Sequence, residues 1–170
     1  SKENEVGKSL KIAFNDIGGN AWTGGITYRK NLLKALREYY PDVKIYIISE
    51  DVDKYDNNEY DKIIKYSSNG ARITRMVHRL FRNKFLYDFK LKKAIKSVDG
   101  GVDVLFPADY SAGKKTASIL WIPDFQILHL PHFFSNKDVS NYDTLMKQAI
   151  KRFPLVVLSS HDAQNDFRKF

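Results

Sequence analysis

The chain has 170 residues, of which 43% are hydrophobic and 14% aromatic, and it carries a net charge of +8 at pH 7. This length suffices for one well-packed core and is short for two, so we predict a single domain over residues 10–170 after a flexible arm over residues 1–9. The absence of cysteine excludes a disulfide scaffold, a thiolate metal site and a cysteine nucleophile, and the lack of a long apolar run or secretory leader predicts a cytoplasmic protein.

The first predicted elements are a strand, a glycine-rich loop and a helix. Residues 11–16 form a short apolar run that is typical of a buried strand. The helix carries apolar residues at helical spacing from Tyr28 to Tyr39, with Thr23 predicted as its N-cap. A helix start offers unpaired N–H groups and the positive end of the helix dipole, so we predict a phosphate-binding site at Gly24 and Gly25. Together with two earlier glycines they make up the loop: Gly18, Gly19, Gly24 and Gly25.

The middle of the chain predicts two more strands and a long helical region. Residues 43–49 form a second apolar run rich in isoleucine, and residues 61–66 form a shorter run with polar ends, which suits the edge of a sheet. The acidic and asparagine-rich tract between them is predicted to be a loop. Over residues 72–97 apolar side chains recur at helical spacing, which predicts one broken helix or two consecutive amphipathic helices.

The positive charge of the chain is concentrated in this helical region. Residues 72–96 contain nine basic residues and one acidic residue, which accounts for the whole net charge of +8. Like charges along one helix face repel each other unless a partner compensates them, so we predict contact with an anionic membrane surface, peripheral at its cytoplasmic face. A solvated basic face that serves solubility is the alternative. The residues predicted to form this surface are Arg72, Arg75, Arg79 and Arg82.

The last part of the chain alternates strands and helices. Apolar runs at residues 102–106 and 116–122, each stopped by a proline, predict two buried strands. An aromatic-rich segment follows, and then a helix over about residues 139–152 that starts near Ser135 or Asn136. Residues 154–159 predict the last strand. Ser160 is predicted to cap a helix that is still running at the end of the chain, which leads us to expect a larger protein.

This alternation predicts the fold class. Most of the predicted strands are continuous apolar runs, which is typical of a parallel sheet covered by helices on both faces. We therefore predict a Rossmann-like three-layer α/β/α sandwich with a mostly parallel sheet of about six strands. Ligands bind such sheets at the carboxyl ends of the strands. Those ends are the glycine loop, Asp109 and Tyr110, residues 123–131, and residues 159–162.

The common sequence motifs of nucleotide and metal sites match this chain poorly. The glycine spacing matches neither the dinucleotide fingerprint G-x-G-x-x-G nor the P-loop, and glycines at such a turn often serve only to let a helix pack closely on a sheet. Glu50, which lies 25 residues beyond Gly25, imitates the ribose-binding acid of that fingerprint. His129 and His132 lie near Asp124, but no further ligand has a convincing spacing. We therefore predict no metal, and favour aromatic packing and loop hydrogen bonds for these histidines.

Three motifs, in this order, resemble the amino-terminal domain of glycosyltransferase family 4, which has the GT-B architecture. They are TGGITYRKNLLKAL, WIPDFQILHLPHFF and VVLSSHDAQNDF. In that family a Gly-Gly pair opens the first helix, a strand leads into an HD-type motif followed by a proline and aromatics, and a Ser-rich strand end precedes a helix containing an Asp. The resemblance extends over residues 11–170. Many members have a His where this chain has Pro123, so the role of that His is not carried over, and Asp124 and Gln126 become the candidates at this strand end.

The resemblance implies an activity. It implies a hexosyltransferase of cell-envelope polysaccharide biosynthesis that transfers a sugar, with retention, from a nucleotide diphosphate sugar to a glycan or lipid-linked acceptor, without an obligatory cofactor. A carboxy-terminal domain of the same protein would hold most donor contacts, so we expect this chain alone to be inactive. Gly24 and Gly25 would meet the donor phosphates, and Asp124 is the candidate catalytic residue. The candidate acceptor cleft has side chains suited to sugar hydroxyls, namely Asp109, Tyr110, Asp124, Gln126 and Ser160.

Two other functions remain open. A nicotinamide-dinucleotide-binding Rossmann domain of an oxidoreductase would need Glu50 to sit over the glycine loop. A non-enzymatic module for anionic surfaces would explain the charge of residues 72–96. That stretch has no recognisable base-reading motif, so we predict no nucleic-acid partner.

Overall fold

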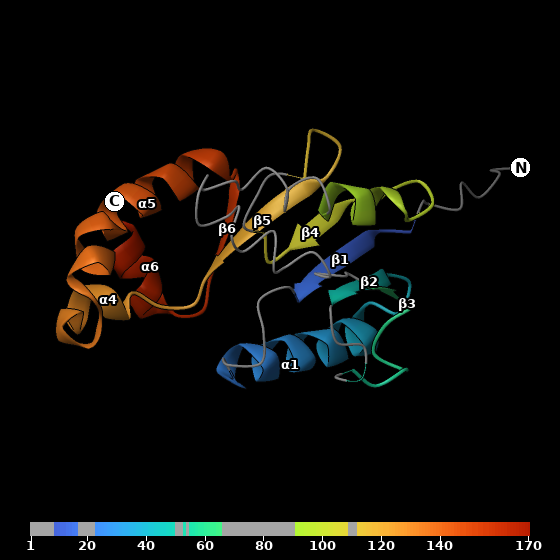
Figure 1. The fold of residues 1–170 in the computed structure, drawn as a ribbon. Coiled ribbons are helices and arrows are strands. Elements are labelled where there is room, and N and C mark those ends of the chain that lie inside the picture. The colour runs from blue at the N-terminus through green and yellow to red at the C-terminus, as the bar shows by residue number, and fades with distance from the viewer. Residues whose placement is uncertain (1–8, 17–22, 50–52, 54, 66–90, 109–111) are drawn as a thin grey trace, which may run out of the picture. The chain divides into compact units, whose positions relative to one another are not determined.

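The structure, a computed structural model, describes residues 9–16, 23–49, 53, 55–65, 91–108 and 112–170. Its six strands form a parallel sheet in the order β3-β2-β1-β4-β5-β6 (Figure 1). This confirms the predicted Rossmann-like fold with about six strands, and the strand predicted for an edge, β3, lies at an edge. The strands are β1 (Lys11–Asp16), β2 (Lys44–Ser49), β3 (Lys62–Lys65), β4 (Val104–Phe106), β5 (Ala117–Ile122) and β6 (Leu155–Leu158).

Five labelled helical segments accompany the strands. Residues 91–96 form a further helical segment, which is the described part of the region predicted as helical from 72 to 97. No helix among the described residues is both long and apolar enough to cross a membrane. The labelled helices are α1 (Thr23–Tyr39), α4 (Gln126–His129), the 3-10 helix η1 (Pro131–Phe133), α5 (Asn136–Arg152) and α6 (His161–Phe167).

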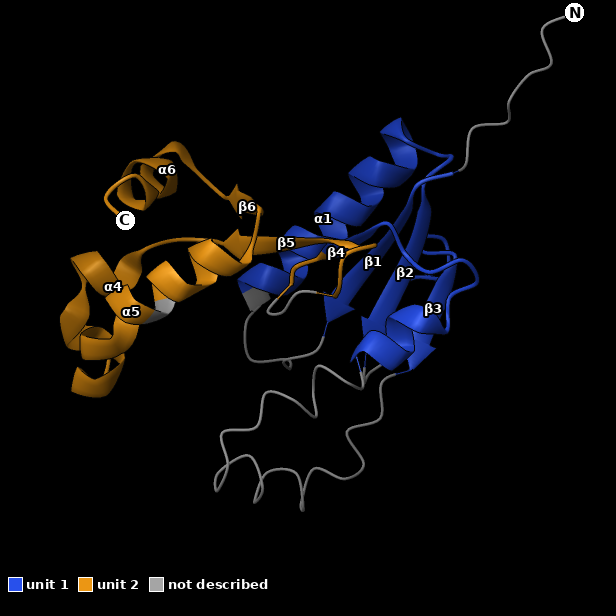
Figure 2. Ribbon diagram, turned by 90° about the horizontal axis from the view of Figure 1, so that it is seen from above, with its two compact units in different colours: residues 1–105 blue, residues 106–170 orange. Residues whose placement is uncertain are grey.

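The chain forms two compact units, residues 1–105 and residues 106–170 (Figure 2). In unit 1, α1 lies on one face of the strands and the helical segment 91–96 lies on the other (Figure 1). Leu33 of α1, Ile47 of β2 and Leu91 of that segment are all buried, so apolar side chains from each layer meet in the core. The prediction that residues 10–170 form a single domain stays a prediction.

A carboxylate joins three elements of unit 1. Asp61, just before β3, accepts hydrogen bonds at 2.7 Å from the Arg37 guanidinium of α1 and from the Ile45 backbone N–H of β2. Burial would raise the pKa of Asp61, but these hydrogen bonds and the charges of Arg37 and Lys44 outweigh it and lower the pKa. The ionised carboxylate therefore holds the end of α1 and the start of β2 in place.

Unit 2 has its own aromatic core. Phe125 follows β5 and is buried, and the Phe170 ring stacks on it with ring centroids 5.7 Å apart. Tyr142 of α5 meets the Phe125 ring edge-on at 6.5 Å. The cluster also contains Ile122 of β5 and Ala163 of α6, so the core joins the end of β5 to α5 and α6.

Several element boundaries differ from the sequence predictions. Thr23 is the first residue of α1 and not its N-cap, so Gly24 and Gly25 lie inside the first helical turn. The aromatic-rich segment contains the short helices α4 and η1, which were not predicted. The prediction that the last helix continues to the end of the chain is wrong: α6 ends at Phe167, and the chain turns so that Phe170 packs on Phe125.

Candidate functional site

The ends of β1 and β2 carry a buried polar network. The parallel register pairs Asp16 with Ser49, the last residues of the two strands. The Ser49 hydroxyl donates to Asp16 Oδ2 at 3.2 Å, and Arg29 of α1 forms an ion pair with Asp16 Oδ1. Burial, and then the charge of Asp16, raise the pKa of Tyr55, which keeps its phenol protonated. These groups fix α1 to the strand ends, while the buried Nε of Arg29 has no hydrogen-bond partner among the described residues.

The predicted phosphate site lies at the start of this helix. Gly24 is exposed and Gly25 is buried, both in the first turn of α1. The first N–H groups of a helix lack partners within the helix, so a first-turn position is compatible with anion binding. Gly18 and Gly19 lie outside the described residues, as does Glu50 of the nicotinamide alternative.

The largest concentration of predicted site residues is in unit 2. A cavity of about 510 Å³ opens between the segment after β5, α4 and α6. Three of the five predicted acceptor-cleft residues, from the ends of two neighbouring strands, lie in its wall. The residues that line it are Asp124, Gln126, His129, Leu130, Ser160, Asp162, Ala163, Asn165 and Asp166.

Local hydrogen bonds hold the predicted residues in the cavity wall. Asp124 Oδ1 accepts the backbone N–H of Gln126 at 3.1 Å, which leaves Oδ2 for other donors. Ser160 is the N-cap of α6, as predicted, because its hydroxyl oxygen accepts the N–H of Ala163 at 3.0 Å. Its hydroxyl hydrogen stays available to a ligand.

A histidine–carboxylate pair lies in the same wall. His129 Nε2 of α4 lies 2.6 Å from Asp166 Oδ2 of α6, and Lys169 Nζ lies 2.7 Å from Asp166 Oδ1. The hydrogen bond from Lys169, followed by that from His129, lowers the pKa of Asp166, so this carboxyl is ionised at neutral pH. Burial and then the charges of Asp124 and Asp166 raise the pKa of Tyr142 to about 12.

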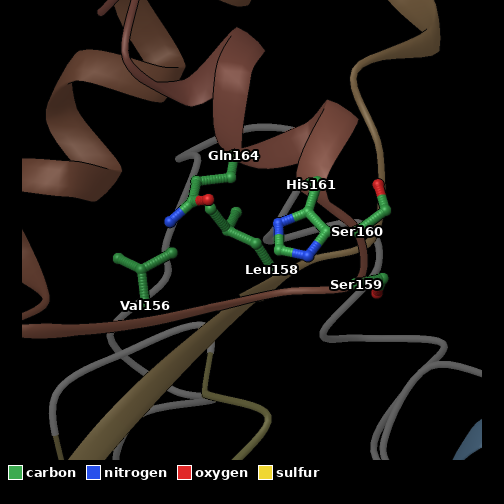
Figure 3. A pocket seen from close by; sticks show the side chains of 6 residues that line it. All are labelled: Val156, Leu158, Ser159, Ser160, His161 and Gln164. Atoms are coloured by element: carbon green, nitrogen blue, oxygen red, sulfur yellow. The ribbon is translucent and has the colours of Figure 1, made fainter.

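A second cavity, of about 460 Å³, lies where β6 leads into α6. Figure 3 shows its wall, in which Val156 and Leu158 are apolar and the residues at the helix start are polar. Ser160 lines both cavities. Ser159, beside it, accepts a hydrogen bond at 2.8 Å from the Trp121 indole of β5, which ties the ends of β5 and β6 together.

The structure brings some predicted site residues together and leaves others undescribed. Asp124, Gln126 and Ser160 share one cavity. The other two acceptor-cleft candidates, Asp109 and Tyr110, lie outside the described residues. So does the whole predicted anionic surface, namely Arg72, Arg75, Arg79 and Arg82.

The two histidines near Asp124 each contact another side chain. The His132 ring packs against the Phe133 ring, with ring centroids 4.4 Å apart, and His129 forms a hydrogen bond with Asp166. These contacts agree with the packing and hydrogen bonds favoured from the sequence. Within the described ranges, no three His, Cys, Asp or Glu side chains are placed to hold a metal ion.

Sequence reasoning missed two features of these sites. One sequence feature could have indicated the Asp16–Arg29 pair, namely a carboxylate at the end of an apolar strand. The His129–Asp166 pair had none, because its members are 37 residues apart and α4 is too short to show a helical period. In comparisons with known proteins, neither a protein-family model nor a curated protein sequence matches this chain.

Proposed function

We propose that this chain is the acceptor-side, amino-terminal domain of a retaining glycosyltransferase, which transfers a sugar from a nucleotide diphosphate sugar to a glycan or lipid-linked acceptor. One observation carries the proposal. Asp124, Gln126 and Ser160 come from the ends of two different strands and line a single cavity. Carboxyl ends of parallel strands are where such folds bind their ligands.

The chemistry of the cavity wall suits a polyhydroxylated ligand. Carboxylates such as Asp124 and Asp162 accept hydrogen bonds from sugar hydroxyls, while the Gln126 amide both donates and accepts. Leu130 and Ala163 add apolar surface for the C–H face of a sugar ring. The volume of about 510 Å³ is in the range of small-molecule sites.

The donor side of the proposal rests on the first turn of α1 and on the family resemblance. Backbone N–H groups at Gly24 and Gly25, with the helix dipole behind them, would meet the negative charge that develops on the leaving diphosphate. A carboxy-terminal domain of the same protein would supply the remaining donor contacts. The proposal also places Arg72, Arg75, Arg79 and Arg82 at an anionic membrane surface.

The proposal is tested on the whole protein that carries this chain. The assay measures nucleoside diphosphate released from UDP- and GDP-hexoses with glycan and lipid-extract acceptors, and the anomeric configuration of the product is read by NMR. Gln126→Leu removes a hydrogen-bonding side chain from the cavity, so kcat/KM for the acceptor should fall about tenfold to a hundredfold. Asp143→Asn, an exposed change on α5 outside the cavity wall, is the control and should have no effect.

Membrane attachment needs a separate measurement. Binding to anionic vesicles should weaken as salt is raised, and the joint change of Arg75, Arg79 and Arg82 to Gln should abolish it. Equal binding to neutral and anionic vesicles would refute this part of the proposal.

A further inference from the structure

The His129–Asp166 pair joins a buried carboxylate to an accessible imidazole. Asp166 is 7% exposed, whereas the side chain of His129 is 58% exposed and lies in the wall of the unit 2 cavity. The distance of 2.6 Å between Nε2 and Oδ2 is that of a short, charge-assisted hydrogen bond. One ring nitrogen is thus held by Asp166, and the part of the chain that the structure describes offers the other no hydrogen-bond partner.

The hydrogen bond decides which nitrogen carries the lone pair. An ionised carboxylate can only accept, so Nε2 must donate, and in the neutral imidazole the lone pair is then on Nδ1. Among the described residues, Nδ1 has no hydrogen-bond partner. Lys169 keeps Asp166 ionised by binding its other oxygen. An exposed lone pair on an imidazole oriented by a carboxylate is the arrangement of a general base.

We propose that His129 is the acid–base side chain of this cavity and that Asp166 is its positioning residue. The substrate group is a hydroxyl of a sugar acceptor, and this identification rests on the proposed function. Nδ1 takes the hydroxyl proton while the acceptor oxygen bonds to the anomeric carbon of the donor sugar, on the same face from which the diphosphate departs, so that the anomeric configuration is retained. The bond from that carbon to the diphosphate breaks, and the diphosphate leaves with the electron pair. The proton ends on the imidazolium, which Asp166 stabilises.

A purely structural role for the pair makes a different prediction. If His129 served only to tie α4 to α6, any hydrogen-bond donor of similar size would replace it without chemical consequence. The reactivity of His129 would then depend only on how exposed its ring is. His132 supplies the comparison, because it is an exposed imidazole for which the described residues provide no carboxylate partner.

The test uses p-nitrophenyl acetate and the 170-residue chain. Nδ1 attacks the acetyl carbon, p-nitrophenolate leaves with the electron pair, and water then hydrolyses the acetylimidazole to acetate. His129→Gln, which keeps a donor for Asp166, should lower the rate about tenfold, since it removes the oriented base. His132→Gln should change the rate less than twofold by the same reasoning. The rate of Asp166→Asn should lie between the rates of the two histidine variants. Thermal melting should show that all three variants fold.

The pH profile separates chemistry from structure. The pH–rate profile of the wild type should differ from that of His129→Gln, which lacks the imidazole, and from that of Asp166→Asn, which lacks the carboxylate that binds Nε2. The charged groups nearest to His129 come from two segments: Asp124, after β5, and Asp162 and Asp166 of α6 line the same cavity, and Lys169, after α6, binds Asp166.

Two results would overturn the proposal: an equal loss in His129→Gln and His132→Gln, or an unchanged rate and profile in Asp166→Asn. The ester needs no nucleotide sugar, so the proposed function does not affect this result. If the ester reacts through His129 but the whole protein transfers no sugar, the glycosyltransferase proposal fails and the acid–base assignment stands.

Discussion

Both units have polar groups at the carboxyl ends of their strands, but the two groups differ in what surrounds them. In unit 1 the side chains of Asp16 and Arg29 are 1% and 11% exposed, so their ion pair is enclosed. In unit 2 the side chain of Asp166 is 10% exposed, but that of its partner His129 is 58% exposed and faces a cavity. An enclosed pair satisfies its own charges and serves the fold. A pair with one open partner keeps hydrogen-bonding capacity for a ligand.

The largest expected effect is at the enclosed pair. Asp16→Leu should destabilise the chain by about 3–5 kcal/mol, because the charge of Arg29 would stay buried without its partner. Urea denaturation followed by circular dichroism measures this loss. The double variant Asp16→Leu/Arg29→Met should recover most of it, since no unpaired charge is left. A double variant as unstable as the single one would show that Asp16 acts through something other than this pair.

The next effect concerns Asp61, a unit 1 carboxylate that is also structural but less enclosed. Asp61→Asn should cost about 1 kcal/mol, after allowance for solvent screening of its partly exposed side chain. The folded pKa of Asp61 is lowered. Its contribution is therefore present above about pH 4, the ordinary range of a carboxyl group, and is lost as the pH falls through the folded value. Denaturation at pH 7 and pH 3 should show the gap between wild type and variant closing in acid.

Two N-caps in unit 2 separate fold stability from ligand binding. Ser135 caps α5 and Ser160 caps α6, and each accepts a helix N–H, at 3.1 Å and 3.0 Å. Each change to Ala should cost about 1 kcal/mol. Only Ser160 lines the cavity, so only Ser160→Ala should also raise the acceptor KM of the whole protein. An equal rise in KM for Ser135→Ala would mean that the effect travels through stability.

The smallest stability effect should be at His129. Its side chain is more than half exposed, and the ion pair with Asp166 is therefore screened by water. His129→Gln should shift the melting temperature less than either serine variant, while it lowers the rate of the ester reaction described above. A melting shift as large as that of Asp16→Leu would place this pair with the structural ones.

The fold could be predicted from the sequence because burial on both faces leaves a simple signal. A parallel strand covered by helices is a continuous apolar run, as in residues 44–49 and 117–122, and the long helix α1 shows several turns of its period. Ser160 was predicted because a cap acts on neighbouring residues. The pairing of His129 with Asp166 depends on how α4 meets α6, and no local pattern encodes it. The short helices α4 and η1 were missed because they are too short for a period.

The central claim is that the cavity of unit 2 binds the acceptor. Its most direct test compares sugar transfer by the whole protein with transfer by the double variant Asp124→Asn/Gln126→Leu. Wild type should release nucleoside diphosphate from one of the UDP- or GDP-hexoses in an acceptor-dependent way. The double variant should lose at least a hundredfold in kcat/KM for the acceptor at an unchanged melting temperature, since two polar partners of the ligand are removed. Acceptor-dependent release that is equally fast in the double variant, or no release from any of these donors, would contradict it.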